Sequence, residues 1–349
     1  MELASLFDYY HDPFIARYAD QLSGVQWQAF NAIGRCRTPA SGELQVHCTA
    51  CDQQESRPLS CGHRSCPKCQ NHEATQWLDR QRAKLLPVDY FMVTFTLPAE
   101  LRPLARCHQS EIYAMLFSCA VSTLKDFGLN PKKLGIEMGM TAILHTHTRR
   151  LDYHPHVHII VPGGGIDTRR RQWKKIKGKF LFNEFALAKV FRARILSALN
   201  AAKLPLPAGM PTKWVVDCKH VGSGKPALEY LSRYLYRGVI SEKNIIANQD
   251  GNITFQYTES RTGQTQTRTL KGEDFLWLLL LHVLPKGFRR ARDYGFLHGN
   301  AKKRLLLVQL VLRVIIQPNI SSPRPVFKCR KCKSPMCIIA VIRPSRQSG

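Results

Sequence analysis

The hydrophobic pattern of the chain changes repeatedly between the spacing of helices and that of strands. Apolar residues recur every three or four positions in four segments, which is typical of amphipathic helices. These segments are residues 1–35, 73–87, 99–127 and 183–201. Alternating runs rich in β-branched and aromatic residues predict strands in three others. These are residues 90–97, 135–147 and 151–162. The mixture, with neighbouring strands joined by short turns, predicts an α+β fold built on an antiparallel sheet.

One predicted strand carries a row of histidines. Within Leu151–Gly165, the side chains of His154, His156 and His158 alternate before a β-branched run that ends at a proline and three glycines. Side chains two residues apart on a strand point to the same face. Imidazole is the commonest metal ligand in proteins, so the row forms part of a metal site, or else a polar face exposed to solvent.

A further ligand is expected from the preceding strand. Residues 148–152 form a predicted hairpin loop between the two strands. If the strands pair about this loop, His145 lies opposite His156 and on the same face. His145 is therefore the preferred third ligand, and three other residues compete with it. They are His147, Asp152 and His154.

A second segment of interest is the helix predicted over residues 225–238, which a proline begins and a glycine ends. Tyr230 and Tyr234 are four residues apart and share a face of this helix. Arg233 and Arg237 form a second pair at the same spacing. A tyrosine pair on a helix is, by itself, more often a packing feature than a catalytic one.

The chain contains twelve cysteines and no basic segment followed by an apolar one at its start. We therefore expect a cytoplasmic protein, in which cysteines bind metals rather than form disulfides. Two C-x-x-C pairs are expected to close one structural zinc site, with Cys61 or His63 as possible substitutes for one ligand. The pairs are Cys48 with Cys51 and Cys66 with Cys69. Cys329, Cys332 and Cys337 make an incomplete zinc ribbon near the other end.

The charge balance indicates a polyanionic partner. Lys and Arg number 51 against 25 acidic residues, which gives a net charge of +26. Nucleic acid is the first choice, and neither a membrane nor a small-molecule substrate is expected. Basic residues with interleaved aromatic ones are the candidate DNA contacts. They are Arg169, Arg170, Arg171, Trp173, Lys174, Lys175, Arg233, Arg237, Lys286, Arg289, Arg290 and Arg292.

Several motifs together resemble those of the HUH-type, two-tyrosine rolling-circle transposases of the insertion-sequence-91 family. They are S-C-G-H-R-S-C-P-K-C-Q, F-M-V-T-F-T-L-P, L-H-T, H-P-H-V-H before P-G-G-G, Y-L-S-R-Y and H-V-L-P-K-G-F-R-R-A-R-D-Y-G-F. The resemblance implies that His156 and His158 bind a catalytic Mg²⁺ or Mn²⁺, and ligand chemistry favours Mn²⁺. It also implies that Tyr230 and Tyr234 are the nucleophiles.

The implied function is nicking and rejoining of single-stranded DNA at element ends through a 5′-phosphotyrosine intermediate. The alternatives are a plasmid-type replication initiator or relaxase, and an inactive zinc-dependent DNA-binding remnant. We expect an HUH nuclease domain with an N-terminal zinc-binding module, and we divide the whole chain into five segments. These are a helical segment over 1–35, the zinc module over 36–75, the nuclease domain over 88–240, a β/helical extension over 241–300 and a basic tail over 301–349.

Overall fold

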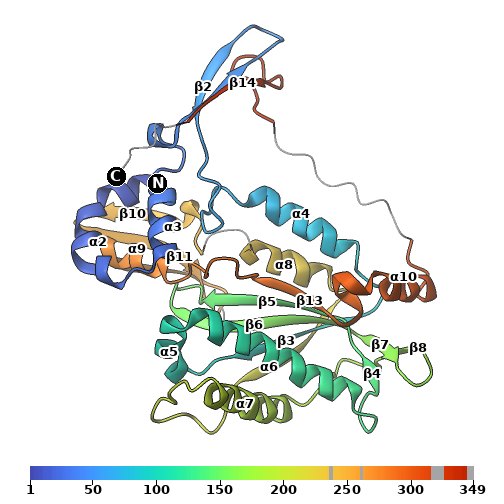
Figure 1. The fold of residues 1–349 in the computed structure, drawn as a ribbon. Helices are drawn as coiled ribbons and strands as arrows, with labels where there is room; N and C mark the ends of the chain where they lie inside the picture. The colour runs from blue at the N-terminus through green and yellow to red at the C-terminus, as the bar shows by residue number, and fades with distance from the viewer. Residues whose placement is uncertain (236–238, 260–261, 316–325, 344–349) are drawn as a thin grey trace.

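The computed structural model describes residues 1–235, 239–259, 262–315 and 326–343, with the backbone alone for residues 233–235. At its centre lies a five-stranded antiparallel sheet with strand order β13-β5-β6-β3-β9 (Figure 1). The strands are β3 (Tyr90–Thr96), β5 (Met140–His147), β6 (Tyr153–Pro162), β9 (Val216–Gly222) and β13 (Ala291–Tyr294). The expectation of an α+β fold is confirmed.

Helices cover both faces of this sheet (Figure 1). One face carries α5 (Arg102–Cys107), α6 (Gln109–Leu129) and α7 (Glu184–Ala201), and the other carries α4 (Asn71–Arg82) and α8 (Lys225–Leu235). Alternation along β6 divides its side chains between these layers. Val157 and Ile159 enter the core beneath α6 and α7, whereas Ile160 enters the core beneath α8. His156 and His158 have the parity of Ile160 and face α8.

Helix α6 is long and apolar enough, by length and composition, to cross a membrane. It is nevertheless a core helix of this domain, because it packs on β5 and β6 and its Tyr113, Leu116 and Phe117 side chains have no exposed area. A buried core helix passes the same length and hydropathy test as a membrane span, so its composition indicates packing against the sheet.

The N-terminal helices share a core with a segment more than 200 residues away. Helices α1 (Leu3–Tyr9), α2 (His11–Tyr18) and α3 (Gly24–Gly34) pack against α9 (Gly272–Leu280) and a sheet of three strands. The strands are β10 (Ile245–Gln249), β11 (Asn252–Thr258) and β12 (Thr265–Lys271). The apolar faces of the expected segments 1–35 and 241–300 are therefore buried together, which corrects their treatment as separate units. β13 also belongs to the expected segment 241–300, but it pairs with β5 at the edge of the central sheet instead of joining the other strands of that segment.

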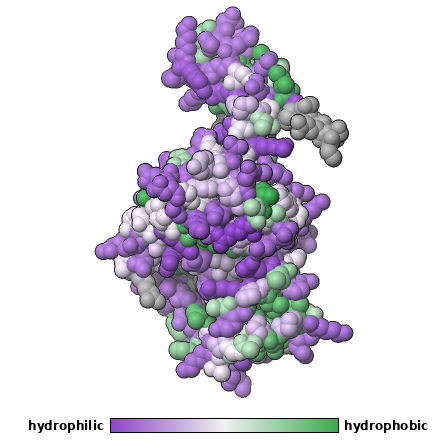
Figure 2. Space-filling model, turned by 90° about the vertical axis from the view of Figure 1, so that its left-hand side faces the viewer, coloured by the Kyte–Doolittle hydropathy of each residue, from purple (hydrophilic) through white to green (hydrophobic). Residues whose placement is uncertain are grey.

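A small lobe projects from this body through a narrow neck (Figures 1 and 2). It contains β1 (Glu43–His47), β2 (Gln54–Pro58) and β14 (Cys337–Ile342), with β1 in the middle. Strand β14, which belongs to the expected basic tail over 301–349, thus completes the sheet of the N-terminal module. The remaining elements are β4 (Ile136–Glu137), β7 (Gly164–Asp167), β8 (Gln172–Lys175) and α10 (Lys302–Val311), which lie at the far end of the central sheet.

Candidate metal centre and nucleophile helix

Three imidazoles meet on the sheet face that α8 covers. The hairpin aligns His145 directly with His156, as the sequence predicts, and places Ile143 opposite His158. The ring centroid of His145 lies 5.2 Å from that of His156 and 4.5 Å from that of His158. The centroids of His156 and His158 are 4.8 Å apart. One ring nitrogen from each histidine lies within 4.8 Å of the other two. The arrangement has the size of a metal site.

Hydrogen bonds fix the orientation of two of these rings. The His156 Nδ1 lies 2.7 Å from the backbone carbonyl of His154, which only accepts, so Nδ1 carries the proton. The Nε2 lone pair of His156 is therefore available to bind a metal ion. The His158 Nδ1 lies 2.9 Å from the hydroxyl of Thr94 on β3. Such contacts orient imidazoles and set their tautomers at metal sites.

The cluster is neutral at physiological pH, with His145 and His158 buried and His156 half-buried. Burial lowers the pKa of His156 to about 3 and that of His158 to about 4, although the nearby Asp217 carboxylate acts in the opposite sense on His158. Burial, followed by the charges of His158 and His156, also holds the pKa of His145 well below its usual range. A neutral imidazole is the form that binds metals. The three residues therefore fit a divalent ion, and an all-imidazole set suits Mn²⁺ better than Mg²⁺.

The residues that competed with His145 have other contacts. Arg102 donates a hydrogen bond to His154 Nδ1 at 2.8 Å, and Arg268 donates one to Asp152 at 2.8 Å. The His147 ring lies beside that of His282, with centroids 5.2 Å apart. Among the described residues, the group that reaches metal-binding distance on this face contains His145 and none of these competitors.

Helix α8 brings Tyr230 to the same face of the sheet. Its Leu228 and Leu231 are buried in one core with Ile143 and Ile160, and the half-buried Tyr230 packs against that core. Tyr230 also lines a groove of about 940 Å³, into which His147 extends from β5. The side chains of Tyr234 and Arg233, and all of Arg237, lie outside the described residues.

The structure separates the cysteines that the sequence grouped in one site. One cluster is Cys36, Cys61, Cys66 and Cys69, and the other is Cys48, Cys51, Cys329 and Cys332. The predicted set is therefore wrong, because the β1–β2 hairpin carries the first C-x-x-C pair away from the second. Cys61, expected as a possible substitute, belongs to the first cluster, whereas His63 belongs to neither. Cys36 was missed because it lacks a neighbouring cysteine in sequence.

The basic hairpin β7–β8 differs partly from expectation. Arg169, Arg170 and Arg171 are exposed at its tip, and Lys174 and Lys175 are exposed along β8. The Trp173 ring instead packs edge-on against Phe296, with centroids 5.9 Å apart, and lies over Gly164. A ring held in this way supports the hairpin, and a contact between Trp173 and bases stays a prediction.

The second basic segment contributes to a groove of about 820 Å³ between α4 and β13. Of the described residues lining it, six are cations and only Asp293 is a carboxylate. The cations are Arg64, Arg80, Lys84, Arg289, Arg290 and Lys302. Two predicted contacts lie elsewhere. Lys286 is exposed, and the guanidinium of the half-buried Arg292 stacks on the Phe117 ring at 4.4 Å. Neither residue lines this groove, and their contacts with DNA stay predictions.

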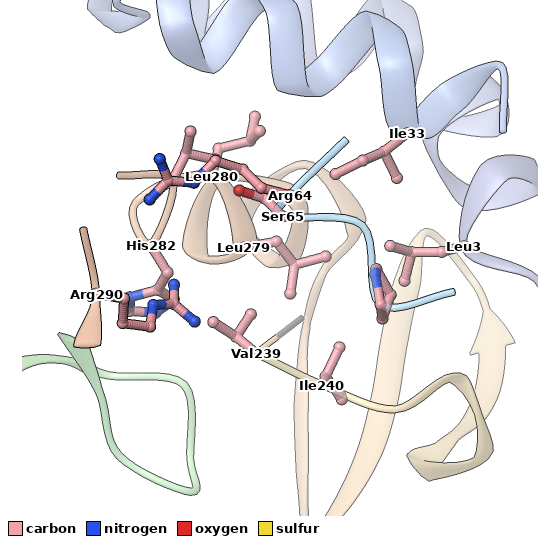
Figure 3. Close-up of a pocket in the computed structure, with 12 residues that line it drawn as sticks. Leu3, Ile33, Arg64, Ser65, Val239, Ile240, Leu279, Leu280, His282 and Arg290 are labelled. Atoms are coloured by element: carbon pink, nitrogen blue, oxygen red, sulfur yellow. The ribbon is translucent and has the colours of Figure 1, made fainter. Parts of the chain in front are cut away.

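A small cavity of about 20 Å³ lies where the N-terminal helices meet the central domain (Figure 3). At one end of it, the side chains of Arg290 and His282 lie side by side. His282 is 2% exposed, and its Nε2 lies 3.1 Å from the carbonyl of Leu151. Burial lowers its pKa to about 4, and Arg290 adds to that effect. Sequence reasoning noted H-V-L-P only as a family motif and missed this histidine.

Comparison with known proteins identifies two matched regions in the chain. Residues 6–97 match the family model described as "Transposase zinc-binding domain", and residues 139–304 match the one described as "Putative transposase". "Putative transposase y4qJ" of Sinorhizobium fredii is 35% identical over 334 residues, covering 88% of this chain and 83% of that protein. "Transposase for insertion sequence element IS801" of Pseudomonas savastanoi pv. phaseolicola is 30% identical over 296 residues, covering 79% and 71%. No solved structure matches the chain.

Proposed function

Because the chain belongs to the insertion-sequence-91 family of transposases, with an N-terminal zinc-binding domain, we propose that it cleaves and rejoins single-stranded DNA at the ends of its element through a covalent tyrosine intermediate. One observation carries the proposal. The neutral imidazoles of His145, His156 and His158 gather on the sheet face that is covered by the helix bearing Tyr230. A metal-binding cluster and a hydroxyl nucleophile on one face are the two components that such a reaction needs.

The histidine cluster would hold the catalytic ion through ring nitrogens that burial keeps unprotonated. A bound Mn²⁺ or Mg²⁺ supplies Lewis-acid polarisation of the scissile phosphate. The protein's own contribution is orientation. The carbonyl of His154 fixes the tautomer of His156, and the hydroxyl of Thr94 restrains the ring of His158.

In the proposed reaction, the Tyr230 phenolic oxygen attacks phosphorus and forms a new oxygen–phosphorus bond. The bond from phosphorus to the 3′ oxygen breaks, and the phenolic proton ends, directly or through solvent, on the departing 3′-OH. The product is a 5′-phosphotyrosine. Attack by the 3′-OH of another strand restores the phosphodiester and the tyrosine hydroxyl, so no external energy source is required. Tyr234 would hold a second strand in the same way.

The substrate would reach this site along cationic surfaces. The groove between α4 and β13 is lined by six cations, and Arg290 at its edge also acts electrostatically on the buried His145 and His147. The groove beside Tyr230 carries Arg37 and Arg149 as well. Phosphate contacts along both grooves would lead a single strand past the histidine cluster. We place this activity in the cytoplasm.

The proposal is tested by incubating the protein with Mn²⁺ and labelled single-stranded oligonucleotides from both element ends. A covalent protein–DNA adduct that survives denaturing electrophoresis is expected. Tyr230→Phe or Tyr234→Phe should abolish the adduct, and the variant that loses the first adduct identifies the first nucleophile. The matched control is Tyr9→Phe, which removes the same hydroxyl from a side chain that is 66% exposed on α1. Binding of every oligonucleotide without any adduct would reduce the protein to a DNA-binding module.

A further inference from the structure

Four cysteines from the two ends of the chain meet in the small lobe. The Sγ atoms of Cys48 and Cys332 are 3.5 Å apart, and those of Cys51 and Cys329 are 3.6 Å apart. All four sulfurs lie within 4.8 Å of one another, and none forms a disulfide. A tetrahedral Zn–S₄ site with bonds of about 2.3 Å has sulfur–sulfur edges of about 3.8 Å. The cluster therefore has close to the dimensions of a zinc site.

The backbone around the two cysteine pairs is built in the same way. The N–H of Cys48 donates to the carbonyl of Gln53 at 2.9 Å, and the N–H of Cys329 donates to the carbonyl of Ser334 at 2.9 Å. The residue after each pair adopts a left-handed conformation that non-glycine residues rarely adopt. These residues are Asp52 (φ 56°) and Lys333 (φ 64°). Two matching turns that point their thiols at one position indicate a common ligand.

The lobe has too small a core to hold these turns by itself. Among the described residues of the lobe, the buried apolar side chains besides Cys48 and Cys329 are Val46 and Met336. Segments of this size normally obtain their folding free energy from a metal or a disulfide. Strand β14 pairs with β1, but most of its apolar side chains remain exposed. Their burial therefore contributes little to the folding free energy of the lobe.

We propose that Cys48, Cys51, Cys329 and Cys332 bind a second structural zinc ion, which fastens the C-terminal segment to the N-terminal module. Binding releases four thiol protons to solvent and leaves four thiolates on the metal, with no change of oxidation state. The site is closed and has no position for a substrate, so its role is structural. It takes two ligands from beyond both matched regions, residues 6–97 and 139–304. The inference concerns metal content and chain connection, and it stands apart from the proposed nuclease activity.

Zinc content of the purified full-length protein tests the site directly. Cys329→Ser with Cys332→Ser should bind one zinc fewer per chain than the parent protein. The matched control is Cys337→Ser, which alters a cysteine of the same segment that lies outside both clusters and should leave the zinc content unchanged. An unchanged zinc content in the double variant would overturn the proposal.

A second experiment tests the fastening without relying on a folded double variant. A specific-protease site is inserted after Arg313, and the protein is cut and passed through a sizing column. The fragment containing β14 should stay with the rest of the chain in zinc and separate from it after chelation. In the Cys337→Ser control, the fragment should again be retained in zinc. Release of the fragment from zinc-loaded protein, or retention after complete removal of the metal, would contradict a zinc-dependent connection.

Discussion

His145 and His156 face each other as directly paired residues on β5 and β6, with ring centroids 5.2 Å apart. His147 and Tyr153 close the short hairpin between the strands, and a register shift between His145 and His147 brings His145 opposite His156. His158 adds a third ring 4.5 Å from His145. The geometry thus supports His145 as the proposed third metal ligand and disfavours His154, to which Arg102 donates a hydrogen bond.

We predict that His145→Ala weakens Mn²⁺ binding by at least ~100-fold, because one of three ligands is lost. His154→Ala is the matched control on the neighbouring strand and should change the affinity only a few-fold. Isothermal titration with Mn²⁺, accompanied by a thermal melt of each variant, measures both effects. If the two substitutions weaken binding equally, the third ligand is not His145.

Stability should depend on the buried, neutral His282. Its pKa is about 4 in the folded protein and near 6.5 in an unfolded chain, so the unfolded chain binds more protons between these values. The contribution of neutral His282 to the free energy of unfolding is complete above pH 6.5 and is lost as the pH falls through 4. For this group the loss between pH 7.5 and 5 is about 2 kcal/mol.

Denaturant unfolding of the metal-free protein at both pH values measures this loss. His282→Gln keeps a donor for the Leu151 carbonyl but cannot be protonated. This variant should therefore lose about 2 kcal/mol less stability than the parent on acidification. An identical pH dependence in the two proteins would show that His282 does not contribute.

The cationic groove between α4 and β13 should contribute to DNA binding. Arg80→Ala together with Lys302→Ala removes two exposed cations from it and should reduce affinity for single-stranded DNA roughly tenfold. The slope of log K against log salt should fall by about 1.4, since each phosphate contact contributes about 0.7. Fluorescence anisotropy at several salt concentrations measures the slope. Lys189→Ala, exposed on α7, is the control. An equal loss in the control would indicate only a general charge effect.

The metal cluster could be predicted because its determinants are local. Alternation along β6 places His156 and His158 on one face. A register shift between His145 and His147, next to the five-residue loop, then brings His145 opposite His156 rather than opposite Pro155. A hairpin joins residues close in sequence, so its pairing requires no knowledge of the rest of the fold. The helix at 225–235 was predictable for a similar reason, since its proline, its spacing and its length are written in consecutive residues.

The sequence by itself therefore determined the α+β class, the histidine row with its partner strand, the tyrosine helix and the presence of cysteine pairs. Only the tertiary structure decided how distant segments combine. Cys48 and Cys332 are 284 positions apart, and no periodicity specifies that they meet rather than Cys48 and Cys66. The same holds for β13 at the edge of the central sheet and for α9 among the N-terminal helices. Such contacts depend on which apolar faces and strand edges remain uncovered after local structure forms, and that is a property of the whole chain.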